Sequence, residues 1–373
     1  MVRNKTLVSI ISLLKNLLFI TVPSLLLIFF ACELFFTYVI PGAQFPYVFY
    51  DRNNRILKFD ISQPRTGRYT IGKLAQQRAR WRINNHGWNS DIDYETKMTK
   101  RKRPLIAIIG DSYVEALQVD VEKNVAADLR NMVHGKYDVY SFGISGAPLS
   151  AYLQMSRYVN KYFDPAIIVF IIIHNDFHES LYALNQAVGM MRFDKDASGF
   201  KEINGPYNPT WYRRLIGHSS LARYLWVTLK LDATLFGKKP RPGAVYDEDI
   251  DVSLINEHKD EIAGVTDFIL RRLRSENPSK KIVFLIDAPR NDIYSHAIDN
   301  SSLMPLHRLL KEKCDAYGFY FSDLTGVFKE NFASTGIRFD SPYDYHWNAL
   351  GHRVAAETLF NKLKEISALE NRP

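Results

Sequence analysis

Three residues that could together form a nucleophilic site lie in two distant segments of the chain. Ser112 follows the apolar run Pro104–Gly110, whereas Asp344 and His346 lie near the C-terminus. A serine hydroxyl becomes a nucleophile when an imidazole removes its proton and a carboxylate fixes the tautomer of that imidazole. We therefore expect a catalytic triad of Ser112, His346 and Asp344. Taken singly, a helix-capping serine and a surface histidine would look the same.

Two further segments offer donors for an oxyanion hole. Gly146 lies in the run Ser141–Ala147, where a residue without a side chain brings its N–H close to a ligand. Asn175 follows another apolar run and carries a side-chain amide. A glycine loop of this kind also fits a tight turn or half of a phosphate loop. A dinucleotide-binding site is excluded because the motif G-x-G-x-x-G is absent and no Walker lysine follows a glycine-rich loop.

Short apolar runs separated by amphipathic stretches must position these residues. The expected strands are Leu105–Ile109, Tyr137–Phe142, Ala166–Ile173, Ile282–Ile286 and Phe319–Phe321, and the expected helices include Val121–Val133, Ala151–Tyr162 and His258–Arg274. This alternation predicts an α/β fold whose parallel sheet has helices on both faces. The carboxyl ends of parallel strands form the ligand crevice, so Ser112, Gly146 and Asn175 are expected at one edge.

The order of these blocks resembles the SGNH/GDSL hydrolase superfamily. The blocks are Gly110-Asp111-Ser112, the glycine loop with Gly146, Asn175-Asp176 and Asp344-Tyr345-His346, and they extend from about Pro104 to Leu363. The segment Arg82–Trp88 is similar to one in membrane-anchored bacterial members. The resemblance implies a three-layer flavodoxin-like sheet. It also implies Ser112 as nucleophile, His346 as general base and acid, Asp344 as its orienting residue, and an oxyanion hole from Ser112, Gly146 and Asn175.

Two positions depart from the pattern of that superfamily. The aspartate usually stands three residues before the histidine, a position that Tyr343 occupies here, and Asp344 stands two before. This closer spacing resembles a subset that includes polysaccharide O-acetyltransferase-like proteins, and Asp340 is a weaker substitute for the orienting carboxylate. His174 replaces the glycine that often precedes the asparagine. We expect it either to crowd the oxyanion hole or to contact substrate.

An apolar stretch near the N-terminus, Leu17–Ile40, is long enough to span a membrane as one transmembrane helix. A secretory signal peptide is the alternative, although the stretch is longer than usual and lacks a small-x-small site. Cys32 weakly resembles the end of a lipoprotein signal. The basic residues before the stretch favour a cytoplasmic N-terminus. Glu33 within the span is expected near the interface or paired with a partner helix.

The net charge of +8 is unevenly distributed along the chain. Residues 1–103 hold 17 Lys/Arg and 6 Asp/Glu, a charge of +11, whereas residues 104–373 hold 31 and 34, a charge of −3. A nucleic-acid partner is therefore not expected. We divide the chain into a tail (1–16), a transmembrane anchor (17–40), a basic connector (41–103) and an SGNH hydrolase-like catalytic domain (104–373). An insertion at about 180–255 is expected to cap the site or contact substrate.

No cofactor or metal is expected, because the two cysteines, Cys32 and Cys314, lie in no zinc-binding spacing. The sequence thus predicts a membrane-anchored serine esterase that hydrolyses acyl esters of an envelope carbohydrate or lipid. Its catalytic domain is expected on the extracytoplasmic, periplasmic side of the inner membrane. The alternatives are an O-acyltransferase of the same fold and a non-catalytic polysaccharide-binding envelope protein.

Overall fold

The computed structural model describes residues 11–97, 101–209, 211–229, 231, 246–247 and 250–366. The chain divides into two compact units. One contains the segment up to Phe45 together with Thr70–Gln77 and Thr210–Lys238, and the other contains Pro46–Tyr69, Arg78–Pro209 and Lys239–Pro373. Residues 1–10 of the expected N-terminal tail lie outside the described residues.

Five strands of the larger unit form one parallel sheet. They are β5 (Leu105–Gly110), β6 (Asp138–Gly143), β7 (Ile167–Ile172), β12 (Lys281–Ile286) and β13 (Tyr320–Asp323). Their order is β13-β12-β7-β5-β6, and all neighbouring pairs are parallel. Numbered along the chain, this order is 2-1-3-4-5, which is flavodoxin-like. The predicted fold class is confirmed, and each strand coincides with one of the five expected runs.

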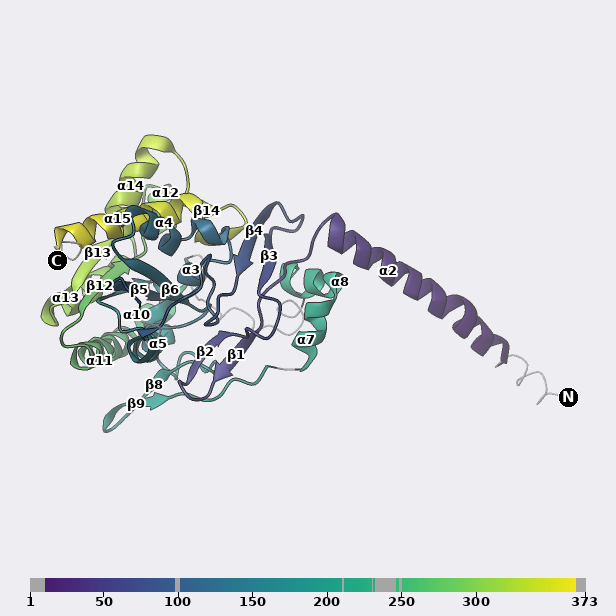
Figure 1. The fold of residues 1–373 in the computed structure, drawn as a ribbon, viewed down its shortest axis with the longest axis horizontal. Helices are drawn as coiled ribbons and strands as arrows, with labels where there is room; N and C mark the ends of the chain where they lie inside the picture. The colour runs from purple at the N-terminus through teal and green to yellow at the C-terminus, as the bar shows by residue number, and fades with distance from the viewer. Residues whose placement is uncertain are drawn as a thin grey trace. The chain divides into compact units, whose positions relative to one another are not determined.

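Alternate side chains of the sheet enter two separate hydrophobic cores. Ala107 and Ile109 of β5 lie in one core, and Ile106 and Ile108 lie in the other. Helices α5 (Leu149–Tyr162), α11 (Lys259–Glu276) and α13 (Met304–Ala316) pack into the first, and α4 (Val125–Met132), α14 (Leu324–Thr335) and α15 (Ala349–Glu365) pack into the second (Figure 1). Because both faces are covered, the central strands are buried along their whole length.

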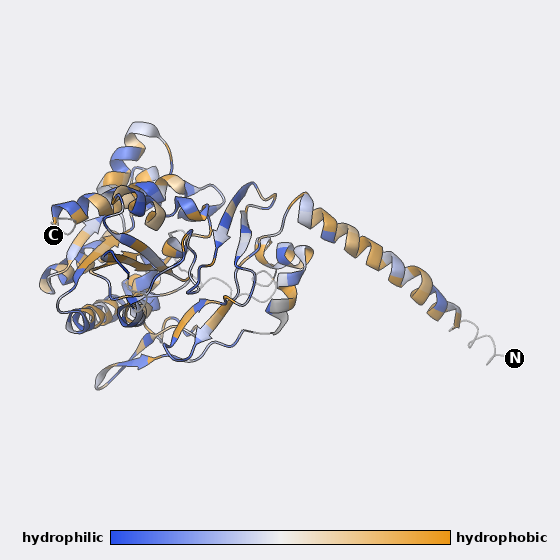
Figure 2. Cartoon of the chain, viewed as in Figure 1, coloured by the Kyte–Doolittle hydropathy of each residue, from blue (hydrophilic) through white to orange (hydrophobic). Residues whose placement is uncertain are grey.

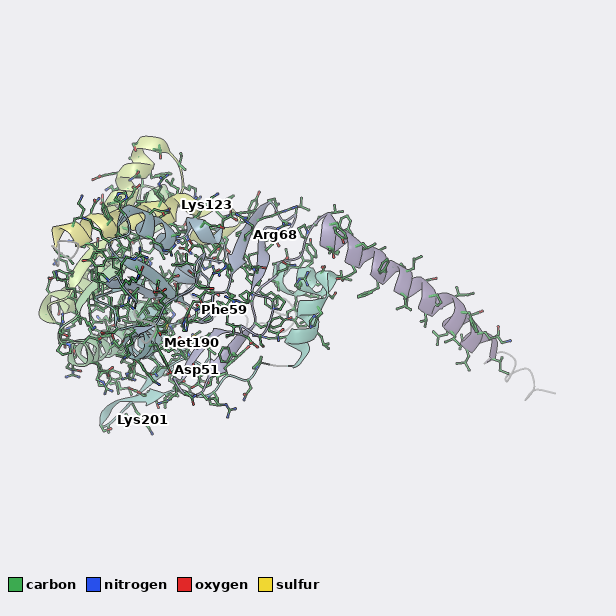
Figure 3. All side chains as sticks on the ribbon, in the orientation of Figure 1. Asp51, Phe59, Arg68, Lys123, Met190 and Lys201 are labelled. Atoms are coloured by element: carbon green, nitrogen blue, oxygen red, sulfur yellow. The ribbon has the colours of Figure 1, made fainter. Side chains whose placement is uncertain are left out.

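The described residues of the basic connector expected at 41–103 contain four strands. Strands β1 (Val48–Asp51) and β2 (Ile56–Phe59) form a hairpin, and β3 (Thr66–Ile71) pairs with β4 (Gln77–Arg82). Phe59, labelled in Figure 3, and Trp88 are at most 1% exposed and belong to the same core as β5. Burial of these large apolar side chains in the core stabilises the segment as folded structure.

Two arginines of the basic run at 100–103 also belong to the folded unit. Arg103 pairs with Asp138 at 2.7 Å, and Arg101 donates to the carbonyl of Phe163 at 2.6 Å. Lys100 lies outside the described residues. The run is therefore not simply a free basic surface facing a membrane.

The expected insertion at about 180–255 is divided between the two units. Strands β8 (Arg192–Asp196) and β9 (Gly199–Ile203) form a hairpin in the larger unit, and α10 (Val252–Glu257) lies in the same unit. Helices α7 (Trp211–His218) and α8 (Ser220–Arg223) belong to the smaller unit, with the apolar N-terminal helix. Its expected role as a cap over the site remains a prediction.

The apolar N-terminal segment is one helix, Ile11–Tyr38, of 28 residues. Its first part contains a π-helical stretch, Leu17–Thr21, and its second part is α2 (Val22–Tyr38). Figure 2 shows hydrophobic residues along almost all of α2, which has no buried residue. Among the described residues this is the helix long and apolar enough to cross a membrane, and a signal sequence passes the same test.

Candidate active site

Ser112 lies at the point where β5 turns into the short helix α3 (Ser112–Glu115). Asp111 caps this helix by accepting a hydrogen bond from the backbone N–H of Tyr113 at 2.9 Å. The helix packs closely on the strand ends, where a Cβ added to Gly143 would meet the backbone nitrogen of Glu115 at 2.1 Å. Glycine at that position thus allows the close approach that holds Ser112 at the carboxyl edge of the sheet.

The C-terminal hairpin brings the imidazole to Ser112. The hairpin consists of β14 (Asp340–Ser341) and β15 (Asp344–Trp347). His346 Nε2 lies 2.7 Å from Ser112 Oγ, and His346 Nδ1 is hydrogen-bonded to Asp344 Oδ1. Residues i and i+2 of a strand point to the same face, which explains how an aspartate two positions before the histidine reaches its ring. The three expected triad residues therefore form one hydrogen-bonded chain.

Asp340, the substitute considered for Asp344, has other partners. Its carboxylate pairs with Arg338 at 3.2 Å and lies 3.7 Å from Arg290. In this arrangement it neutralises arginine charge at the base of the hairpin. The geometry therefore favours Asp344 as the residue that orients His346.

The environment of His346 shifts its pKa in opposing directions. Burial lowers the pKa, but the hydrogen bond and charge of Asp344 and the charge of Asp111 raise it, and the net pKa lies above its ordinary value. An imidazole of raised basicity is a better proton acceptor. The arrangement can therefore remove the proton of Ser112 and hold the imidazolium that results.

Two of the three expected oxyanion donors, Gly146 and Asn175, follow strands that flank β5. β6 and β7 both pair in parallel with β5. Gly146 follows β6 with a φ of +75°, which suits glycine, and a Cβ added there would meet nothing within 4 Å. Asn175 is the first residue of α6 (Asn175–Glu179), directly after β7, and is partly exposed. Their roles as donors to a substrate remain a prediction.

His174 does not occupy the place that the sequence suggested. It is 2% exposed, and its Nε2 lies 2.8 Å from Nε2 of His307, whose Nδ1 contacts Asp323 at 2.7 Å. Burial, together with the charges of His307 and Arg290, holds the pKa of His174 well below its ordinary value. The ring is turned into the protein against His307, and it ties the start of α6 to α13.

Arg290, which the sequence reasoning missed, holds the hairpin in place. It begins α12 (Arg290–Tyr294), is 2% exposed, and donates to the carbonyl of Tyr345 at 2.6 Å and to the hydroxyl of Tyr113 at 2.5 Å. Asp287 accepts from Arg290 at 3.1 Å and from the indole of Trp347 at 2.9 Å. The signal was an Asp-x-x-Arg segment directly after a buried strand of the sheet.

Asp111, Glu115 and Asp176, which follow β5 and β7 in the chain, are buried carboxyl groups. Burial raises the pKa of Asp111 to about 6, and burial and the charge of Asp111 raise that of Glu115 to about 8. Glu115 accepts a hydrogen bond from Ser145, next to Gly146. Asp176 accepts from the hydroxyl of Tyr152 at 2.9 Å, and burial raises its pKa well above the ordinary value. These groups join the loops of the site to one another.

Histidines and acids in the described part of the chain form no group of three or more that could hold a metal ion. His352 of α15 is 1% exposed, and its ring lies against that of Trp347.

No family model matches the sequence, and no curated protein matches it. Similar solved structures include LAE5, an alpha/beta hydrolase enzyme from the metagenome of Lake Arreo (13% identity, 72% of this chain and 97% of that chain, TM-score 0.38). A two-domain esterase active on acetylated mannans is 10% identical over 73% of this chain and 51% of that chain, with a TM-score of 0.40. A member of the lipolytic protein G-D-S-L family from Veillonella parvula is 10% identical (71% and 98%, TM-score 0.35). Similarities at this level carry no functional evidence, so function is inferred from side-chain geometry.

Proposed function

We propose that the chain is a serine esterase that acts through an acyl-enzyme. The observation that carries the proposal is the 2.7 Å contact between Ser112 Oγ and His346 Nε2, with Asp344 on the opposite ring nitrogen. His346 takes the proton of Ser112 as Oγ attacks the ester carbonyl, and then gives that proton to the leaving alcohol. A water molecule, activated by the same imidazole, releases the acid and restores Ser112.

The tetrahedral intermediates carry a negative oxygen that needs fixed donors. The backbone N–H groups of Ser112 and Gly146 and the side-chain amide of Asn175 would supply them. Removing one such donor costs roughly 100–1000-fold in turnover, because the charge develops mainly in the transition state. The order of the motif blocks, the 2-1-3-4-5 sheet and the serine–histidine contact together support membership of the SGNH/GDSL superfamily.

The proposed substrate is an O-acylated carbohydrate or lipid of the cell envelope, met on the extracytoplasmic side of the inner membrane. The helix Ile11–Tyr38 supports a single-pass anchor, and the weak positive-inside bias supports a cytoplasmic N-terminus. Tyr343 and Tyr345, each 51% exposed beside Asp344, offer rings against which a sugar could stack. When a sugar hydroxyl replaces water at the second step, the same acyl-enzyme acts as an O-acyltransferase.

The first test measures release of p-nitrophenol from p-nitrophenyl acetate by the full chain in detergent. We expect Ser112→Ala to lose at least about a thousandfold in kcat/KM, because no other nucleophile replaces Oγ. A fluorophosphonate probe should label the wild-type protein at Ser112 and leave the variant unlabelled. Unchanged turnover in Ser112→Ala contradicts the proposal, and glycan binding without probe labelling favours the non-catalytic alternative.

A further inference from the structure

Glu33 is a carboxylic acid within the apolar helix, five residues before its end at Tyr38. At about 1.5 Å per residue, its Cα lies about 7–8 Å inside that end. A carboxylate at that depth in a spanning helix is costly unless polar partners accompany it. The structure supplies such partners from a segment almost two hundred residues away in sequence.

Hydrogen bonds join Glu33 to the beginning of α8. Its carboxylate accepts from the backbone N–H of Ser220 at 2.5 Å, from that of Leu221 at 3.1 Å, and from Ser219 Oγ at 2.8 Å. Charge-assisted hydrogen bonds of this kind are stronger than neutral ones. The carboxylate therefore fixes the start of α8 at its own depth along the apolar helix.

The contact continues along the next turns toward the end of the apolar helix. Thr37 Oγ1 donates to Ser220 Oγ at 2.8 Å, and the ring of Phe36 stacks on Tyr224 with centroids 4.2 Å apart. A Cβ added to Gly42 would meet the carbonyl oxygen of Ser220 at 2.6 Å, so the backbones are close there as well. All of these residues belong to the smaller unit, and their packing is described within it.

The surroundings of this contact expose several apolar side chains. Leu215 of α7 is 59% exposed and Leu229, just after the π-helical turn Tyr224–Thr228, is 36% exposed. In the same unit, Tyr38 is 77%, Val39 58% and Leu74 62% exposed. Exposed apolar side chains in the unit that contains the proposed spanning helix fit the boundary between lipid headgroups and acyl chains.

We propose that residues 211–229, the docking segment, lie in the interfacial layer of the bilayer beside the end of the spanning helix. The partner is lipid, with Leu215 and Leu229 inserted at the acyl boundary. This inference rests on the proposed membrane anchor. It goes beyond a single-pass anchor because it gives the protein a second, monotopic membrane contact fixed by Glu33.

The test uses spin labels on the full chain in liposomes of phosphatidylethanolamine and phosphatidylglycerol. Labels are attached in Leu215→Cys and Leu229→Cys, with Cys32 and Cys314 replaced by serine. Ile337→Cys is the matched control, because Ile337 is an apolar residue of the larger unit with a similar exposure of 55%. We expect relaxation by oxygen to exceed relaxation by a water-soluble nickel chelate at positions 215 and 229, and the reverse at 337.

The outcomes separate the inference from the anchor. Protein that stays in the membrane after alkaline carbonate, with positions 215 and 229 as accessible to nickel as position 337, overturns the inference alone. Protein that carbonate extracts overturns the anchor and the inference together. Labels shielded from both oxygen and nickel indicate cover by protein, such as a second copy, and also overturn the lipid assignment.

A second measurement tests the part played by Glu33. Arg213, which is exposed, offers a trypsin site within the docking segment. We expect Glu33→Ala in liposomes to be cut there roughly ten times faster than wild type, and Glu33→Gln, which keeps one acceptor oxygen, to lie between them. Esterase activity of the same samples reports that the larger unit is folded. Equal rates for all three proteins contradict the role of Glu33.

Discussion

Asp344 reaches His346 because both lie on one face of a short strand. A spacing of two residues, which looked unusual in the sequence, is the spacing that a strand requires. The larger surprise at this scale is His174, whose ring turns into the protein and meets His307. Sequence reasoning identifies residue types that could do chemistry, but it gives no direction for a side chain whose partner lies 133 residues away.

Asp344→Asn tests the orienting role of this carboxylate. The base acts only when His346 is neutral, and Asp344 raises its pKa, so wild-type activity falls as the pH drops through that raised value. We expect kcat to fall roughly 10³–10⁴-fold in the variant, with the acidic limb of the remaining activity at lower pH. The pH dependence of kcat/KM measures both effects. An acidic limb at the same pH as in wild type contradicts the role of Asp344.

Glu115→Gln tests the buried acid behind the nucleophile. The pKa of Glu115 is raised from 4.5 to about 8, so between these values the native state holds a proton that the unfolded state has released. Wild-type stability contributed by this group therefore falls as the pH rises, by at most about 1.4 kcal/mol per pH unit. We expect the variant to gain stability relative to wild type from pH 5 to pH 8 in urea unfolding.

Glu122→Gln is the control for this measurement, because the side chain of Glu122 is 53% exposed. Its stability relative to wild type should change little over the same range. A difference between Glu115→Gln and wild type that is equal at pH 5 and pH 8 would show that Glu115 is ionised in the folded protein at both values.

At the scale of elements, the sheet was predictable and the strands before it were not. Strands β5 and β7 are continuous apolar runs, since both of their faces are buried, whereas the edge strand β13 has no buried residue. Strand β4 contains few apolar residues, because exposed Arg78 and Arg80 alternate with buried Ala79 and Trp81. Alternation with a period of two residues is typical of a half-buried strand. The high charge of the segment nevertheless favours the interpretation as a connector when the sequence is taken alone.

The position of the β14–β15 hairpin depends on α12 through Arg290. We expect Arg290→Lys to lower kcat roughly 10–100-fold with a smaller change in KM, because lysine cannot donate to Tyr345, Tyr113 and Asp287 at once. Steady-state kinetics on p-nitrophenyl acetate measure the two parameters separately. For a positioning residue we expect kcat to fall by the same factor at every pH, so that the pH profile of the variant keeps the shape of the wild-type profile.

Asp287→Asn combined with Arg290→Met is the control for folding, because it removes both members of the buried ion pair. Breaking only one member of such a pair typically costs about 3–5 kcal/mol, whereas replacing both costs less. If Arg290→Lys retains full kcat, the hairpin is held by Trp347 and Tyr113 without the guanidinium.

At the scale of the whole chain, the positive charge of residues 1–103 is partly used inside the fold. Arg101 and Arg103 fasten the beginning of β6 to the segment before β5. We expect Arg101→Glu with Arg103→Glu to lower the free energy of unfolding by about 3 kcal/mol, because Asp138 is left buried among like charges. Lys102→Glu, exposed in the same run, changes the net charge with little loss of stability.

Urea unfolding at neutral pH measures this difference, and vesicle co-sedimentation of the same proteins measures lipid association. Equal stability of the double variant and Lys102→Glu would show that Arg101 and Arg103 contribute no more to folding than an exposed lysine does. The positive charge of residues 1–103 is thus divided between ion pairs of the fold and the exposed surface.

The pairing of Glu33 with residues 219–221 also has a consequence for biosynthesis. The carboxylate leaves the ribosome 186 residues before Ser219, so at about 5–20 residues per second the apolar helix is complete roughly 10–40 s before its partner exists. If the helix is anchored as proposed, the carboxylate lacks the hydrogen bonds of residues 219–221 during that interval. For an anchored chain, insertion of the helix would therefore precede folding of the later segment, which then supplies the hydrogen-bond partners of Glu33.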